Sequence, residues 1–171
     1  MLNEAIAEYK KAIKIKPDNA GTHCNLGLAY YKKGMLNEAI AEYKKAIKIK
    51  PDNAGTHCNL GLAYYKKGML NEAIAEYKKA IKIKPDNAGT HCNLGLAYYK
   101  KGMLNEAIAE YKETIKIDPK NANIIYYNLA LAYYKKKEYK LAIQYCDKAI
   151  QLGFKPDSKF LKSLEPYRKK K

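Results

Sequence analysis

The chain has 171 residues and a formal net charge of +16, from 33 basic and 17 acidic side chains. Such a charge favours acidic partners, and no apolar run approaches the ~18 residues that a membrane-spanning helix needs. The N-terminus lacks the basic and apolar regions of a signal peptide. Three of the four cysteines follow an internal repeat, and the four show no pairing pattern, as expected in a reducing compartment. We therefore expect a cytoplasmic protein without a membrane segment.

A unit of 34 residues is repeated along the chain. Residues 1–34, 35–68 and 69–102 are identical, and a further copy matches from Met103 through Lys112 before it diverges. A unit of this size cannot bury its own apolar face, so its stability comes from stacking on its neighbours. The identity also fits an array that was duplicated recently or assembled deliberately and has no specific ligand.

The segment Ala20–Lys33 is the first predicted helix of a complete unit. Its apolar residues have the spacing i, i+3, i+4 and i+7 of an amphipathic helix. They are His23, Leu26, Gly27 and Tyr30. Asp18 or Asn19 is placed to cap the N-terminus, and Gly34 is placed to end the helix in the left-handed conformation.

The segment Leu36–Ile49 is the second predicted helix, and Pro51 prevents its continuation. Because only about three residues separate the two helices, they must form an antiparallel hairpin. We refer to helices like 20–33 as first-type and to helices like 36–49 as second-type. Gly27 and Ala39 are small enough to let the two backbones approach closely.

The array begins on a second-type helix, residues 2–15, with no first-type helix before it in the sequence. Its apolar side can pack against helix 20–33 but lacks its other neighbour, and terminal repeats normally need a polar cap. We therefore expect self-association through this N-terminal helix, giving a homo-oligomer. The residues predicted to mediate it are Leu2, Ile6, Tyr9 and Ile13.

The last repeat differs from the others. Its connection after Pro119 is one residue longer, and Lys137 replaces the glycine of the turn. Asp157 and Ser158 then predict the start of an amphipathic helix that covers the end of the array. The predicted organisation is a repeat array over residues 1–156, followed by a capping helix and basic tail over residues 157–171.

Three sequence elements together resemble the tetratricopeptide repeat: His23-x2-Leu26-Gly27-x2-Tyr30, then Ala39-x3-Tyr43, then Pro51. The resemblance implies an all-α, right-handed superhelical solenoid of antiparallel helix hairpins. Two positions depart from the family pattern. His23 replaces the usual large aromatic residue, and Met35 stands where an aspartate would cap the second helix.

The resemblance also implies that the first-type helices line the concave face, where such arrays hold an extended peptide. Matching positions give a set of predicted groove residues, with one asparagine, leucine, tyrosine and lysine from each hairpin. They are Asn25, Asn59, Asn93 and Asn128; Leu28, Leu62, Leu96 and Leu131; Tyr31, Tyr65, Tyr99 and Tyr134; and Lys32, Lys66, Lys100 and Lys135.

The asparagines are similar to the asparagine ladder in the repeat domains of O-linked N-acetylglucosamine transferases. A side-chain amide has two donors and an acceptor, enough to hold a peptide backbone without reading its sequence. The alternative is that these amides only satisfy neighbouring groups of the protein. The lysines form a basic rim, which favours an acidic segment or a C-terminal carboxylate.

No motif for catalysis, metal or cofactor binding is present in the sequence. The repeated His23-Cys24 pair does not predict a metal site, because equivalent residues in neighbouring repeats lie about 10 Å apart. We therefore expect a non-catalytic scaffold that binds a protein or peptide. The alternative of an RNA-binding helical repeat is disfavoured, because most lysines, such as Lys44 and Lys48, lie on the second-type helix.

Overall fold

The computed structural model describes residues 1–168, and the predicted basic tail, Lys169–Lys171, lies outside them. Those residues form ten α-helices and no strand, so the all-α prediction is confirmed. The helices are α1 (Leu2–Ile15), α2 (Ala20–Lys32), α3 (Leu36–Ile49), α4 (Ala54–Lys66), α5 (Leu70–Ile83), α6 (Ala88–Lys101), α7 (Leu104–Ile117), α8 (Asn123–Lys135), α9 (Tyr139–Gln151) and α10 (Ser158–Arg168). None of the helices in this part of the chain is long and apolar enough to cross a membrane.

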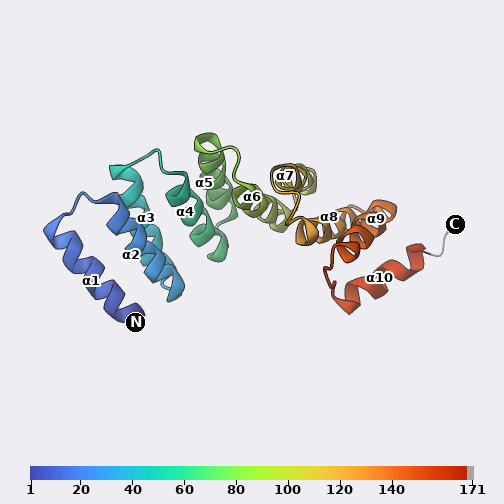
Figure 1. The fold of residues 1–171 in the computed structure, drawn as a ribbon, viewed down its shortest axis with the longest axis horizontal. Helices are drawn as coiled ribbons and strands as arrows, with labels where there is room; N and C mark the ends of the chain where they lie inside the picture. The colour runs from blue at the N-terminus through green and yellow to red at the C-terminus, as the bar shows by residue number, and fades with distance from the viewer. Residues whose placement is uncertain (169–171) are drawn as a thin grey trace. The chain divides into compact units, whose positions relative to one another are not determined.

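The chain divides into two compact units, Met1–Pro85 and Asp86–Lys171. The first contains α1 followed by the hairpins α2–α3 and α4–α5 (Figure 1). The second contains the hairpins α6–α7 and α8–α9, followed by α10 (Figure 1). Within a hairpin the first-type and second-type helices pack along their length. In the first unit α1 also packs on α2 and α3 packs on α4, and in the second unit α7 packs on α8.

The ends of the first-type helices are fixed by side-chain and backbone caps. The Asn19 side chain accepts a hydrogen bond from the Thr22 amide at 3.0 Å, so Asn19 and not Asp18 is the N-cap. Gly34 ends the turn at φ +78°, a conformation that a residue without a Cβ adopts readily. Met35 gives α3 no side-chain cap, as the sequence predicted.

The core of each of the first three hairpins is a tyrosine ring packed on a glycine. A Cβ built on Gly27 would lie 2.7 Å from Cε1 of Tyr43, and Tyr43 is only 1% exposed. The same arrangement joins Gly61 to Tyr77 in the next hairpin, at 2.6 Å. Only glycine allows the ring to lie this close to the facing helix backbone, so what Gly27 admits is the ring of Tyr43, whereas the prediction was a close approach of the two backbones at Gly27 and Ala39.

The last hairpin replaces this pair. Ala130 stands at the glycine position and Cys146 at the tyrosine position, and both are completely buried. The longer connection predicted here is absorbed by the loop 118–122, which precedes α8. Lys137 takes the place of the turn glycine with φ +64°, the only positive φ of a non-glycine residue in the described part of the chain.

Candidate functional site

The predicted groove residues have a consistent pattern of exposure on the first-type helices. The four leucines and four tyrosines are half-buried, whereas the four lysines are exposed. Asn25 is exposed, and the other three asparagines are half-buried. Each first-type helix therefore presents a partly apolar strip beside a positive charge.

Lysines of one repeat lie over tyrosine rings of the preceding repeat. In the first unit, Nζ of Lys66 lies 5.0 Å from the ring centroid of Tyr31. In the second unit, Nζ of Lys135 lies 5.0 Å from the ring centroid of Tyr99. A cation over an aromatic face at this distance is stabilised by the ring quadrupole. These contacts hold the ammonium groups beside the strip.

A small cavity of about 60 Å³ opens on this face of the second unit. It is lined by Leu96, Tyr99, Tyr111, Asn128 and Leu131. Four of these are predicted groove residues, and only Tyr111 comes from a second-type helix. Burial raises the pKa of the Tyr99 hydroxyl above its ordinary value, so the phenol is a neutral hydrogen-bonding group beside an apolar floor.

The asparagines are in two different environments. Nδ2 of Asn59 lies 3.9 Å from Sγ of Cys24 in the preceding repeat, and the Thr56 hydroxyl donates to the same sulfur at 3.5 Å. Asn128, in contrast, lines the cavity of the second unit. One amide thus contacts a neighbouring repeat, as the structural alternative expects, and another lines an opening on the surface of the second unit.

Tyr134 differs from the other groove tyrosines because α10 covers it. Its ring centroid lies 5.5 Å from that of Phe160 and 5.4 Å from that of Tyr139. Phe160 also contacts Tyr127, at 5.5 Å, and Leu164 of α10 is completely buried. The capping helix therefore occupies the strip of the last hairpin.

The structure adds a buried polar network that the sequence reasoning missed. His23 is 4% exposed. Its Nδ1 lies 2.6 Å from Oε2 of Glu42, and its Nε2 donates to the Pro17 carbonyl oxygen at 2.9 Å. Lys45 donates to the other oxygen of Glu42 at 2.7 Å. The signal was present in the sequence as a histidine and a glutamate 19 residues apart in each copy.

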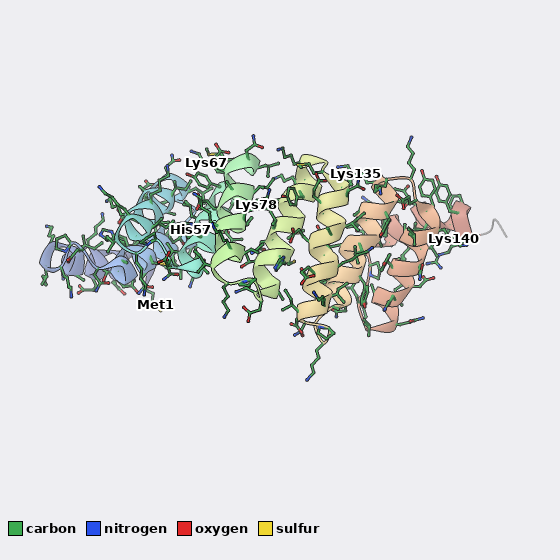
Figure 2. The ribbon with its side chains drawn as sticks, turned by 90° about the horizontal axis from the view of Figure 1, so that it is seen from above. Met1, His57, Lys67, Lys78, Lys135 and Lys140 are labelled. Carbon is green, nitrogen blue, oxygen red and sulfur yellow. The ribbon has the colours of Figure 1, made fainter. Side chains whose placement is uncertain are left out.

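This network lowers the pKa of Glu42. Burial alone would raise that pKa, but the hydrogen bonds from Lys45 and His23 outweigh it. The next hairpin repeats the contact, with Nδ1 of His57 at 2.6 Å from Oε2 of Glu76. His57 lies among the helices, whereas Lys67 lies at the surface (Figure 2). The histidine thus fills the position of the family aromatic and also pairs a buried carboxylate.

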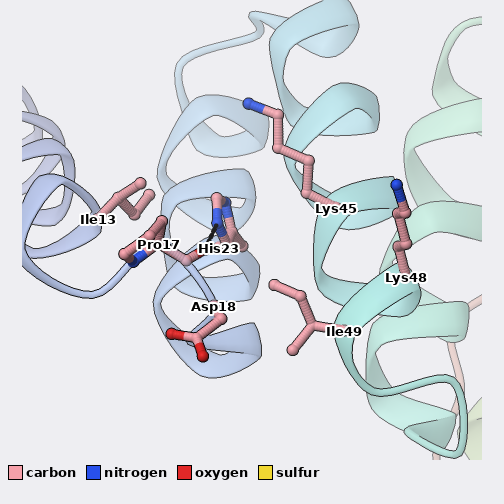
Figure 3. Close-up of a pocket in the computed structure, with 7 residues that line it drawn as sticks. All are labelled: Ile13, Pro17, Asp18, His23, Lys45, Lys48 and Ile49. Atoms are coloured by element: carbon pink, nitrogen blue, oxygen red, sulfur yellow. Dashed lines mark hydrogen bonds between the residues drawn. The ribbon is translucent and has the colours of Figure 1, made fainter.

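A wider cleft of about 600 Å³ lies beside this network in the first unit (Figure 3). It is lined by Ile13, Pro17, Asp18, His23, Lys45, Lys48 and Ile49. An equivalent cleft of about 430 Å³ is lined by Asp52, His57, Lys79, Lys82 and Ile83. The sequence reasoning placed these lysines on the second-type helices but did not anticipate the clefts. Each cleft combines apolar side chains with two lysines and one aspartate, and one of the two lysines is already paired with a glutamate.

The residues predicted to mediate self-association are unequally accessible on α1. Ile6 is 8% exposed, whereas Leu2 is 41% exposed. Tyr9 and Ile13 are half-buried. Only part of the predicted surface is thus available to a second copy.

Residues 1–168 contain no group of three histidine, cysteine, aspartate or glutamate side chains that could hold a metal ion. Cys24, Cys58 and Cys92 are half-buried cysteines, and Cys146 is a buried one; none of the four forms a disulfide in the structure. Burial raises the pKa of the Cys92 and Cys146 thiols, which favours their unreactive protonated form.

Antiparallel hairpins repeated at this interval, with a half-buried strip on each first-type helix, define an α-helical repeat protein. The TPR repeat pattern matches residues 2–34, 30–68, 63–102 and 98–137, and the tetratricopeptide repeat pattern matches residues 124–153. The chain therefore belongs to the tetratricopeptide repeat family. Proteins that share this fold with it are protein-interaction scaffolds.

Solved structures of the same fold agree with this assignment. The protein in the crystal structure of MamA is 32% identical in sequence to this chain, with a TM-score of 0.85 over 88% of each chain. YrrB, described as a TPR protein with an unusual peptide-binding site, is 25% identical, with a TM-score of 0.80 over 99% of this chain and 84% of its own. PilF of Pseudomonas aeruginosa shares the fold. It is 24% identical, with a TM-score of 0.79 over 91% of this chain and 70% of its own. No curated protein sequence matches the chain.

Proposed function

We propose that the chain is a non-catalytic scaffold whose first-type helices hold an extended, acidic segment of a partner protein. The observation that carries this proposal is the cavity lined by Leu96, Tyr99, Asn128 and Leu131. Four positions chosen as groove residues surround one opening, with a half-buried amide and a phenol among apolar side chains. The peptide-binding site of YrrB, a protein of the same fold, is consistent with such a role.

The acidic character of the segment follows from charge. Lys66 and Lys135 lie over the tyrosines of the strip, so their ammonium groups border the place where the segment would lie. The net charge of +16 favours acidic partners over the whole surface. Carboxylates of the segment would pair with this rim, and side-chain amides such as that of Asn128 would bond its backbone.

The test is a titration of fluorescent acidic peptides with the whole chain, followed by anisotropy. We expect saturable binding that weakens with added salt, because exposed charge pairs are screened. Asn59→Ala combined with Asn93→Ala should weaken it about tenfold. Asn71→Ala combined with Asn105→Ala, exposed amides on second-type helices, is the matched control and should leave it unchanged. Equal loss in both double variants would reject the asparagine ladder.

Self-association through α1 remains a second prediction. Leu2 and the half-buried Tyr9 and Ile13 offer apolar surface, as expected for an amplified array that assembles without a specific ligand. Light scattering over a wide concentration range tests it. A concentration-dependent oligomer that ignores every acidic peptide would support assembly and reject the groove, whereas a sharp monomer would reject assembly.

A further inference from the structure

The residues that line the cavity of the second unit have equivalents in the first unit. The cavity is lined by two residues of α6, one of α7 and two of α8. Two repeats earlier, the same positions lie on α2, α3 and α4, and each holds the same residue type. These equivalents are Leu28, Tyr31, Tyr43, Asn59 and Leu62.

The two sets are also alike in their burial and their rim. Tyr43 and Tyr111 are each 1% exposed, and the leucines, the asparagine and the other tyrosine of each set are half-buried. Lys66 and Lys135 lie over a tyrosine of their own set, each with 5.0 Å between Nζ and the ring centroid. The first unit therefore presents the same apolar floor, amide and ammonium group as the second.

These groups select a short apolar side chain beside an acidic one. A cavity of about 60 Å³ holds a few heavy atoms, since about 10–15 Å³ admits one water molecule. Burial raises the pKa of the Tyr43 and Tyr99 hydroxyls, so both phenols stay neutral. The amide can bond a peptide backbone, and the ammonium group can pair with a carboxylate.

We propose that the chain carries two copies of one peptide-binding site, one in each compact unit, and that its partner segment repeats a motif of acidic residues around a short apolar residue. We call the residues lining the cavity the second-unit site and their equivalents the first-unit site. This inference rests on the proposed function. It adds the number of sites and the repetitive character of the partner.

The physical reason is that sites of the same composition do not distinguish between ligands. A segment that fits the first-unit site fits the second-unit site with a similar free energy, so neither is preferred. Two segments with one motif each would therefore fill both sites. A segment with two motifs on a linker that spans the sites would bind more tightly, because its second contact is intramolecular.

The experiment titrates the whole chain with a short peptide of one valine flanked by glutamates, and calorimetry gives the stoichiometry. We expect at least two peptides per chain at low ionic strength, where charge pairs are least screened. Tandem peptides then join two copies of the motif through flexible Gly-Ser linkers of roughly 10 to 40 residues. At the best linker length, we expect binding at least tenfold tighter than that of the single motif.

Asn59→Glu and Asn128→Glu close the two sites separately, because each places a carboxylate at a half-buried position where it repels an acidic peptide. Each variant should lower the stoichiometry by one and remove the advantage of the tandem peptide. The double variant should lower the stoichiometry by two. Asn71→Glu combined with Asn105→Glu is the matched control, because it adds the same charge at exposed positions of second-type helices. It should leave the stoichiometry unchanged, with circular dichroism confirming that all variants fold.

The outcomes separate this inference from the proposed function. One peptide per chain, lost in one single variant and kept in the other, would overturn the second site and leave the proposed function standing. A tandem peptide that binds no more tightly than the single motif at any linker length would overturn the repetitive partner. No binding to the parent chain would reject the proposed function itself. Equal losses in the control pair would show diffuse charge attraction and overturn both.

Discussion

The contact between Gly61 and Tyr77 makes an unusual prediction for a glycine inside a helix. Replacing an interior helical glycine by alanine normally stabilises a protein by about 1 kcal/mol. Here the added Cβ would lie 2.6 Å from Cε1 and 2.7 Å from Cδ1 of Tyr77, whose exposure is 0%. Because the ring is enclosed, it has little room to withdraw, and overpacking of this kind costs about 1–3 kcal/mol. We expect Gly61→Ala to destabilise the fold by about 1 kcal/mol net.

A double-mutant cycle isolates the contact, and the last hairpin suggests its design. There, alanine and cysteine stand together at the two positions, as Ala130 and Cys146. Tyr77→Cys alone should cost about 3 kcal/mol, because it leaves a cavity. In that background Gly61→Ala should instead stabilise by about 1 kcal/mol, since only the helix propensity remains. The coupling energy is then about 2 kcal/mol, within the range for contacting residues.

The assay is chemical denaturation followed by far-UV circular dichroism on the four proteins of the cycle. Ala130→Gly is an internal control, because it removes a methyl group from a hairpin without the tyrosine and should destabilise by about 1 kcal/mol. If Gly61→Ala stabilises the parent chain, the ring yields to the Cβ and the reasoning is refuted. Additive effects in the cycle would refute it equally.

Three further predictions concern charge, capping and backbone strain. The pKa of Glu42 lies below its ordinary value of 4.5 in the folded chain. Its contribution to the free energy of unfolding is therefore present above pH 4.5 and is lost as the pH falls through the lowered pKa. Glu42→Gln should flatten the acid limb of a plot of this free energy against pH, whereas an unchanged limb would show that Lys45 and His23 do not favour the carboxylate. Asn53→Ala should cost about 1 kcal/mol in thermal unfolding, because its side chain caps α4, and a loss below about 0.3 kcal/mol would contradict this role. Lys137→Gly should stabilise by about 1 kcal/mol, because φ is +64° at this residue; a lower melting temperature would oppose this explanation.

The helices themselves could be predicted closely from the sequence. The second-type helix at Leu36–Ile49 has the predicted bounds, and α2 ends at Lys32, one residue before the predicted end. Local signals suffice here, because the Asn19 cap, the Gly34 turn and the break at Pro51 each act within a few residues of the helix they end. The spacing of apolar residues then determines which faces must meet.

The partners of buried polar groups could not be predicted in the same way. The sequence shows His23 replacing an aromatic residue, but the 2.6 Å contact with Glu42 depends on how α2 and α3 cross. Likewise the groove positions were chosen by matching the repeat, yet only packing brings Asn59 to Cys24 and covers Tyr134 with Phe160. Distances between side chains of different helices are set by the packed backbone and have no local signal.

The sequence by itself determined that this chain is a helical hairpin repeat, because period, caps and turn residues recur in the three identical copies. The tertiary structure alone decided how identical sequences differ. Helices α1 and α3 share every residue, yet Tyr9 is half-buried and Tyr43 is 1% exposed. The physical reason is that the burial of a side chain depends on the helices that pack against it. In the described structure α3 has a first-type helix on each side, whereas α1 has one only on the side of α2.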